Sequence, residues 1–353
     1  MKKALSLIAL AVLFTAGILL QIQIPEGWLG QGAFSFLSQN PADANPTYTA
    51  STTVVETPVV SPRTATLFMV GDIMLDRAVR GAVERRGGDY QFLFNNIVLP
   101  KADITFGNLE GAAARSGANQ GSIYSFRMNP DSLLTLAQNN FNVLSIANNH
   151  IGDWGATAAN ETAENIYAAQ MQSTGWSYAT TSDALVIVER NNIRFGFLAF
   201  SEFNSGGAAT ETRKGILLAT APYYEPMIRQ AAQQVDVLIV SLHAGTEYAP
   251  YQNAFQERIA KQAIDAGAHI VVGHHPHVVQ PVVEYNNSII AYSLGNFIFD
   301  QSFSSETTQG GALLINVDKD KNTLSYRFGK TKQDGAFALL PIEWEEAERV
   351  ISF

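Results

Sequence analysis

From about residue 65 onward, short apolar runs alternate with longer segments whose apolar residues recur at helical spacing. The short runs, many of them β-branched, are typical of buried strands, and they occupy residues 66–70, 103–106, 142–146, 236–242 and 268–272. Helical spacing predicts helices at 157–172, from Pro222 onward and around 255–266, and Asn129-Pro130 is typical of a helix start. The alternation predicts a layered α/β domain with buried strands.

Two further patterns predict antiparallel strands. Asn191-Asn192 separates two apolar runs, 185–188 and 193–200, which is typical of a β-hairpin. Near the C-terminus, the runs 278–284, 288–292, 312–317 and 323–328 are joined by short polar turns. The late part of the domain is therefore expected to add antiparallel strands to the α/β core.

The N-terminus has a different character. Lys2 and Lys3 are followed by no charged residue until Glu26, and residues 4–20 are almost wholly apolar. This pattern predicts a single-pass membrane anchor at residues 1–25, with the C-terminal domain on the extracellular side. A cleaved signal segment, which would release a secreted protein, is the alternative. Residues 26–64 are predicted to be a flexible linker, and residues 65–353 one folded domain.

Composition narrows the classes of function. The 353 residues are 46% hydrophobic and carry a net charge of −9, without a cluster of Lys and Arg, so nucleic acid is not an expected partner. The chain has no cysteine, which excludes disulfides, thiolate nucleophiles and cysteine-type zinc sites.

Polar residues with metal-binding chemistry directly follow several predicted strands. The segments are Gly71-Asp72, Gly107-Asn108-Leu109-Glu110, Asn148-Asn149-His150, His243 and Gly273-His274-His275-Pro276-His277. In open α/β sheets, sites form beyond the carboxyl ends of strands, so these segments are expected to meet. Oxygen and imidazole groups delivered to one place suit a divalent metal ion. His269, inside a predicted strand, is assigned no function.

Each segment alone has a simpler explanation. Gly71-Asp72 is typical of a turn or helix cap, and His243 is equally compatible with a hydrogen-bonded core histidine. Three imidazoles within residues 274–277 are harder to explain by packing. Arg77 and Arg80 are candidates for binding an anionic substrate group, or for ordinary pairing on a helix.

Taken together and in order, a set of motifs resembles the bacterial capsule-synthesis CapA family, which is linked to poly-γ-glutamate. The motifs are Gly71-Asp72-Ile73-Met74-Leu75, Asn108-Leu109-Glu110, Ala147-Asn148-Asn149-His150, His243-Ala244-Gly245-Thr246-Glu247-Tyr248, Gly273-His274-His275-Pro276-His277 and Tyr292-Ser293-Leu294-Gly295-Asn296-Phe297. The family is similar in fold to calcineurin-like metallophosphoesterases. The resemblance therefore implies a four-layer α/β/β/α sandwich with a site for two metal ions.

The resemblance also implies residue roles. Metal ligands would be Asp72, Glu110, Asn149, His243, His275 and His277, and His274 is the alternative to His275. His150 would be the catalytic general acid. Supporting or substrate-contacting residues would be Asn108, Asp153, Glu247, His274 and Asn296. Asp153 and Glu247 would orient His150 and His243 or hold nearby backbone. The expected cofactor is one or two ions of Mn, Zn or Fe.

Two positions depart from the wider superfamily, because Met74 replaces a histidine and Asn108 replaces an aspartate. A single ion is therefore as compatible with the sequence as two. The implied function is a membrane-anchored extracellular protein of capsule or poly-γ-glutamate synthesis with a metal-dependent hydrolase-like site, working with other synthesis subunits. The alternative is a non-catalytic scaffold or polymer-handling subunit with a degenerate metal site.

Overall fold

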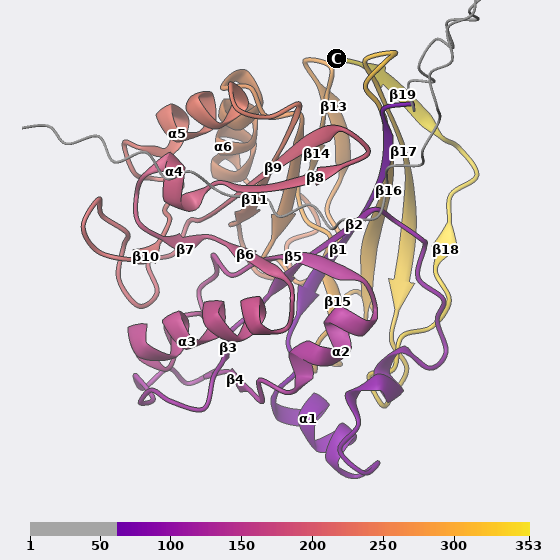
Figure 1. Cartoon of the computed structure of the whole chain (residues 1–353). Helices are drawn as coiled ribbons and strands as arrows, with labels where there is room; N and C mark the ends of the chain where they lie inside the picture. Colours follow the sequence, from indigo (N-terminus) through magenta and orange to yellow (C-terminus); the bar gives the residue numbers. More distant parts are fainter. Residues whose placement is uncertain (1–61) are drawn as a thin grey trace, which may run out of the picture. The chain divides into compact units, whose positions relative to one another are not determined.

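The computed structural model describes residues 62–353, which build two β-sheets with helices on their outer faces (Figure 1). The first sheet comprises β1 (Thr64–Ile73), β2 (Ile104–Leu109), β5 (Phe141–Ser145), β6 (Gln172–Thr174), β15 (Asn296–Ile298), β16 (Gln309–Asp318), β17 (Thr323–Lys332), β18 (Glu343–Trp344) and β19 (Arg349–Ser352). The second comprises β8 (Val186–Arg190), β9 (Ile193–Ser201), β11 (Val237–His243), β12 (Ile270–His274), β13 (Val282–Tyr285) and β14 (Ser288–Ala291).

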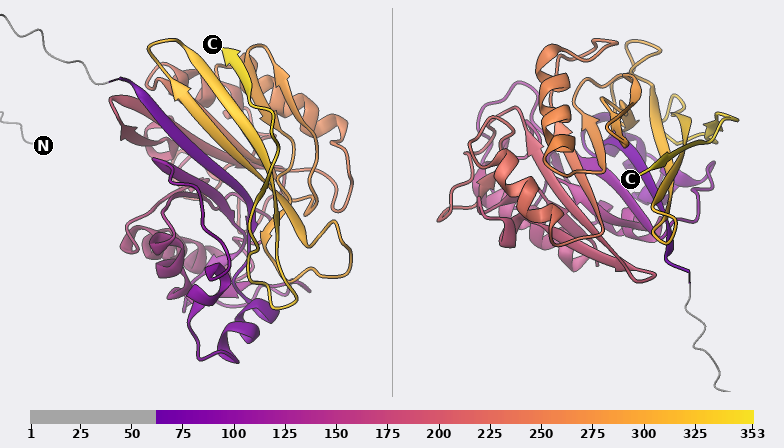
Figure 2. Two further views of the ribbon diagram at one scale, coloured as in Figure 1. Left: turned by 90° about the vertical axis from the view of Figure 1, so that its right-hand side faces the viewer. Right: turned by 90° about the horizontal axis from the view of Figure 1, so that it is seen from above.

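The remaining elements flank these sheets. The helices are α1 (Arg77–Glu84), η1 (Tyr90–Phe94), α2 (Ser132–Gln138), α3 (Gly155–Ala168), α4 (Thr181–Ala184), α5 (Tyr224–Ala232) and α6 (Ala254–Asp265). Two short ribbons pair β3 (Ala112–Ala113) with β4 (Arg127–Met128), and β7 (Trp176–Ser177) with β10 (Gly215–Ile216). Figure 2 shows the long indigo β1 beside the yellow strands that follow it in the sheet.

Successive side chains of a strand point to opposite faces of the sheet, and this arrangement produces three large apolar cores. One face of β1 places Leu67 and Met69 against the second sheet, where Phe106 stacks on Phe197 at 5.7 Å between ring centroids. The opposite face of the first sheet packs against α1, α2 and α3. The outer face of the second sheet packs against α5 and α6. The layers therefore run helix, sheet, sheet, helix.

The carboxyl ends of the parallel strands meet at one rim. In the first sheet, Asp72 of β1 is in register with Asn108 of β2 and Asn296 of β15. In the second sheet, His243 of β11 is in register with His274 of β12. Because the two sheets pack face to face, these registers place carboxylate, amide and imidazole groups opposite one another.

The α/β class and the predicted hairpin are confirmed. β8 and β9 pair antiparallel, and Asn191 and Asn192 have φ of 52° and 59°, the left-handed values of a type I′ turn. The predicted end of the first strand at Gly71 is wrong, because β1 continues to Ile73 between β2 and β15.

Other boundaries also shift. The helix predicted to end at residue 172 stops at Ala168, and Gln170, with φ of 63°, turns the chain into β6. The helix predicted from Asn129-Pro130 begins at Ser132. The strand predicted from residue 278 begins at Val282, after Pro281, which has no backbone N–H to donate to a ladder.

The predicted anchor at residues 1–25 and nearly all of the predicted linker at 26–64 lie outside the described residues. The part that is described belongs to the domain: Thr64 opens β1, the Arg63 N–H donates to Asp320 at 3.0 Å, and the Arg63 guanidinium pairs with Asp236 at 3.2 Å. Within residues 62–353, none of the helices has both the length and the apolar composition that crossing a bilayer requires.

Candidate metal centre

Two glycines let the strands approach closely at the rim. A Cβ at Gly71 would lie 1.9 Å from the Gly295 carbonyl oxygen, and one at Gly273 would lie 1.9 Å from the Tyr292 carbonyl oxygen. Only glycine fits such contacts. The residues that follow, Asp72 and His274, are fully buried and face each other, with His274 Nδ1 3.1 Å from Asp72 Oδ1.

Both carboxylate oxygens of Asp72 are hydrogen-bonded. Its Oδ1 accepts a hydrogen bond from Asn108 Nδ2 at 2.9 Å, and its Oδ2 accepts from the His275 backbone N–H at 3.3 Å. Burial alone would raise its pKa, but hydrogen bonds and charge from His274 and His277 hold the pKa well below the usual value. Asp72 is therefore a carboxylate, the form that binds a metal.

Glu110 is buried with much less support. Its Oε1 has no hydrogen-bond partner among the described residues, and it lies 3.7 Å from His277 Nε2 and 3.9 Å from His150 Nε2. Among these residues, its Oε2 accepts only a long hydrogen bond from Asn108 Nδ2, at 3.5 Å. Burial raises the pKa of Glu110 well above its usual value, opposed by the charge of His277. A cation bound here would compensate the cost of burying this carboxylate.

His243 and Asn149 meet across the two sheets. His243 Nε2 lies 2.7 Å from Asn149 Oδ1, and its Nδ1 lies 3.3 Å from Asn108 Nδ2. Burial, followed by the charge of His275, lowers the pKa of His243 well below its usual value. The ring is therefore neutral, which is the protonation state of a metal ligand.

His275 and His277 form the second half of the centre. His275 Nδ1 is buried without a partner among the described residues, and burial together with the His277 charge lowers the pKa of His275 to about 3. Burial would lower the pKa of His277 as well, but Glu110 and Asp72 raise it to about 9. The left-handed φ of 96° at His275 and 58° at His277 is unusual for residues other than glycine.

Two groups of side chains bring ligand atoms within 4.8 Å of one another, and each could hold an ion. They are Asp72, Glu110 and His243, and Glu247, His275 and His277. His275, and not His274, belongs to such a group, which favours His275 as the ligand. Glu247, predicted to orient His243 or to hold nearby backbone, lies within reach of His275 and His277.

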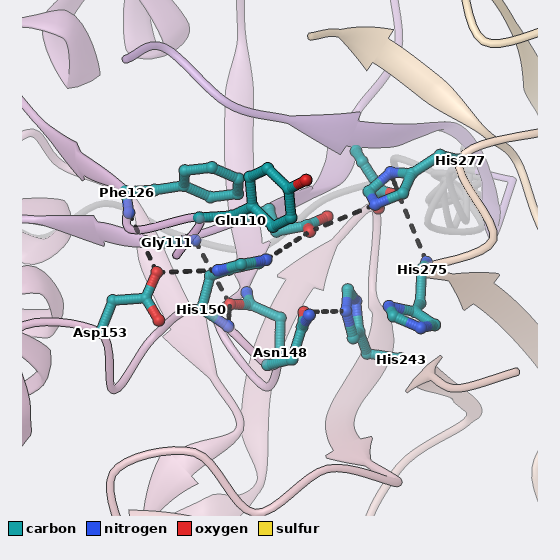
Figure 3. Close-up of polar contacts among 12 residues, drawn as sticks. Glu110, Gly111, Phe126, Asn148, His150, Asp153, His243, His275 and His277 are labelled. Atoms are coloured by element: carbon teal, nitrogen blue, oxygen red, sulfur yellow. Dashed lines mark hydrogen bonds and ion pairs between the residues drawn. The ribbon is translucent and has the colours of Figure 1, made fainter. Parts of the chain in front are cut away.

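His150 lies beside this centre in an oriented position (Figure 3). Its Nδ1 is 2.7 Å from Asp153 Oδ2, which also accepts the Phe126 backbone N–H at 2.9 Å. The Phe126 ring packs on the imidazole, with 4.0 Å between centroids. Because Asp153 holds Nδ1, Nε2 is left facing Glu110 and the candidate ligands, where a general acid would act.

Asn296 supports the centre from β15. Its Oδ1 lies 3.0 Å from His277 Nδ1, and its Nδ2 donates to the Thr307 carbonyl at 2.9 Å. Asn108 has a similar role between Asp72 and His243. These contacts fix ring orientation, the usual task of residues behind metal ligands.

Sequence reasoning placed Asn148 in a polar segment but gave it no role in the network. Its Nδ2 donates to Asn108 Oδ1 at 3.2 Å and to the Leu109 carbonyl at 2.8 Å, while its Oδ1 accepts from the backbone of Gly111 and His150. The available signal was a polar residue shortly after the buried strand β5. The ring of Phe203, 4.3 Å from His275, had no such signal.

The donor set fits a divalent ion. It combines two buried carboxylates, an amide oxygen and neutral imidazoles, groups that suit Mn, Zn or Fe. Three buried atoms in it have no partner among residues 62–353: Glu110 Oε1, His274 Nε2 and His275 Nδ1. Buried polar atoms are normally paired, so their concentration at one rim indicates a ligand-binding site.

Fold and donor set define a two-sheet α/β domain with a buried histidine–carboxylate centre suited to divalent metal. Residues 66–301 match the family model described as bacterial capsule synthesis protein PGA_cap, and the chain belongs to this family.

Two curated relatives agree with this membership. The chain is 32% identical over 284 residues to the PGA biosynthesis protein CapA of Bacillus subtilis (strain 168), covering 79% of this chain and 71% of the relative. It is 32% identical over 291 residues to the capsule biosynthesis protein CapA of Bacillus anthracis, covering 78% and 70%.

Among solved structures, the protein TT1561 of Thermus thermophilus aligns with 74% of this chain and 98% of its own, at 10% identity and a TM-score of 0.38. A similarity of that level supports no functional conclusion.

Proposed function

We propose that this member of the capsule-synthesis family is a membrane-anchored extracellular protein whose metal centre hydrolyses or transfers a phosphoester or amide bond during capsule or poly-γ-glutamate production. The observation that carries the enzymatic part is the set of unpaired buried atoms at the rim, among the described residues, next to an oriented histidine. A protein that needed this rim only for packing would gain stability by pairing or removing such atoms.

Different residues of the chain would bind the metal and donate the proton. Asp72, Glu110, Asn149 and His243 would hold one ion, and Glu247, His275 and His277 would hold a second or complete the first. A bound ion would supply Lewis-acid activation of water and of the substrate oxygen. His150, held by Asp153 through Nδ1, would give the proton on Nε2 to the departing group.

The enzymatic proposal is tested on the purified full chain. We expect about one or two Mn or Zn ions per chain, and substantially less in His277→Ala and Asn149→Ala. Hydrolysis of bis(p-nitrophenyl) phosphate should fall roughly 100-fold or more in His150→Ala while bound metal is retained. His269→Asn, which changes a histidine outside the centre, is the matched control and should keep both metal and activity.

The competing hypothesis is a non-catalytic scaffold or polymer-handling subunit. Met74 and Asn108, which replace a histidine and an aspartate of the wider superfamily, favour it. Metal-loaded wild-type protein that hydrolyses neither a phosphodiester nor a γ-glutamyl amide would support the scaffold, and protein that binds no metal would remove the enzymatic proposal.

The membrane location of the protein is proposed from Lys2, Lys3 and the apolar residues 4–20. Its partners are proposed from the family to which the chain belongs. The full chain is expected in the membrane fraction, with the domain accessible to protease added outside the cell. Other capsule-synthesis subunits are expected to co-purify with it. Recovery of the domain in the medium, with a new N-terminus, would replace the anchor by a cleaved signal.

A further inference from the structure

Arg77, the first residue of α1, has a backbone conformation that its residue type disfavours. Its φ is 52°, in the left-handed region. Residues other than glycine and asparagine rarely adopt this region, because their Cβ crowds the backbone there. An arginine at such a position suggests that its side chain is needed there.

The guanidinium of Arg77 is held in place from several sides. Its Nε pairs with Asp300 Oδ2 at 3.0 Å, and the Asp300 side chain is only 3% exposed. The Ala78 N–H donates to the same oxygen at 3.2 Å. The guanidinium carbon lies 5.3 Å from the centroid of Phe126 and 5.9 Å from that of Tyr124, within the range of cation–π contacts.

These contacts connect the Arg77 guanidinium to His150 through one aromatic ring. Phe126, on which Arg77 rests, is the ring that packs on the catalytic candidate His150 (Figure 3). Tyr124 is 64% exposed, so the cation borders solvent. Arg77 and His150 therefore share one aromatic neighbour at the edge of the site.

The outer nitrogens of Arg77 are free. The ion pair uses Nε, and neither Nη1 nor Nη2 donates to any other residue among 62–353, while the side chain is 38% exposed. Arg80, the other candidate, is engaged by Asp76 and by the Arg127 carbonyl. The sequence could not separate these two arginines, whereas their contacts do.

A free guanidinium edge presents parallel N–H donors that match two oxygens of one oxyanion. The centre and its border contain Asp72, Glu110 and Asp153, in a chain of net charge −9, so a cation outside the candidate ligands favours the binding of an anionic substrate.

We propose that Arg77 is a specificity-determining residue that binds a carboxylate or phosphoryl group of the substrate at the edge of the metal centre. This rests on the proposed function, since it assigns the substrate class of the same site. Asp300 positions the guanidinium, and the strained backbone of Arg77 aims it at the substrate.

The test measures binding of two probes to the Mn-loaded full chain by calorimetry: a trimer of γ-linked glutamate and inorganic phosphate. In Arg77→Gln, binding of at least one probe should weaken roughly tenfold or more, with bound metal unchanged. Arg77→Lys should restore part of the affinity, because it keeps the charge but loses the fork. Arg85→Gln, which removes an exposed charge from the end of the same helix, should bind like wild type.

The two probes identify the source of the oxyanion, since loss for the trimer alone indicates a carboxylate and loss for phosphate alone a phosphoryl group. Arg77→Gly separates function from folding: it relieves the left-handed strain, so it should unfold no earlier than Arg77→Gln and still bind weakly. Equal affinity of wild type and Arg77→Gln for both probes overturns the proposal, as does wild type that binds neither. If the chain binds no metal but still binds the trimer through Arg77, the enzymatic proposal fails and this one stands.

Discussion

Polar side chains at the amino ends of the strands are partly exposed and paired, whereas those at the carboxyl ends of the same strands are buried and incompletely paired. Before β1 and β11, Arg63 meets Asp236 at 3.2 Å, and Asp236 also accepts the Arg194 N–H at 2.9 Å. At the carboxyl ends of β1 and β2, Asp72 and Glu110 are fully buried, and Glu110 Oε1 has no partner among the described residues.

The histidines show the same contrast. His269, at the amino end of β12, accepts the Leu238 N–H through Nδ1 at 3.1 Å, so its ring serves the backbone. His275, beyond the other end of β12, has a buried Nδ1 without a partner among residues 62–353. The difference indicates that polar groups at the amino ends of the strands stabilise the fold, whereas those at the carboxyl ends bind a ligand.

The largest expected effect comes from metal removal. A ligand present at about 1,000 times its dissociation constant stabilises the folded state by about 4 kcal/mol. Chelation should therefore lower the unfolding midpoint of the wild type markedly, and calorimetry with and without EDTA measures it. The same drop in His277→Ala as in wild type would contradict a centre at the carboxyl rim.

Glu110→Gln should change metal affinity and metal-free stability in opposite directions. The neutral amide loses a ligand charge, so Mn affinity should fall roughly 100-fold, about 2.7 kcal/mol. Without metal, removal of a buried carboxylate with a raised pKa should leave stability unchanged or raise it by about 1 kcal/mol. Titration calorimetry and denaturant unfolding of the metal-free protein check the two signs; strong destabilisation of the metal-free protein would contradict the argument.

His269, at the amino end of β12, should make the stability of the folded domain decrease in acid. Burial lowers the pKa of His269 to about 4, below the usual 6.5, so between these values the unfolded chain binds the extra proton. Its contribution is complete above about pH 6.5 and is lost as the pH falls toward about 4, by up to about 3 kcal/mol. His269→Asn keeps an acceptor for the Leu238 N–H and should flatten this dependence in urea unfolding at several pH values. Equal pH slopes in both proteins would refute the assignment.

The smallest change in stability is expected for the ion pair at the amino ends of the strands. Arg63→Ala removes an ion pair whose side chains are 34% and 27% exposed, and such pairs contribute about 0.5 kcal/mol. Denaturant unfolding should show a loss of this size, and metal affinity should not change. A large loss of metal affinity in Arg63→Ala would mean that the two rims are coupled.

Local patterns were sufficient to predict much of the fold. The strand and helix alternation, the Asn191-Asn192 turn, and the position of Asp72, His243 and the 274–277 cluster at or just beyond the carboxyl ends of strands all depend on neighbouring residues in the sequence. What failed depends on distant partners. β1 continues past Gly71 because it pairs there with β2 on one side and with β15, far along the chain at Asn296–Ile298, on the other.

For the candidate site, the sequence was sufficient to predict residue types but not the arrangement of their side chains. Residue types at strand ends indicated Asp72, Glu110 and His277, but the direction of each side chain was set by contacts that no local pattern encodes. The left-handed backbone at His275 and the approach of Glu247 to His277 are examples. The aromatic neighbours Phe126 and Phe203 come from loops whose course depends on the assembled domain.

The candidate ligands are distributed between residues 72 and 277, with Asp72 and Glu110 on the first sheet and Glu247, His243, His275 and His277 on the second. A nascent chain that ends before His277 cannot assemble them, and a chain whose halves have folded but not docked offers only fragments. Uptake of an ion would therefore come last in maturation and would act as a molecular check that both halves have joined in the right register.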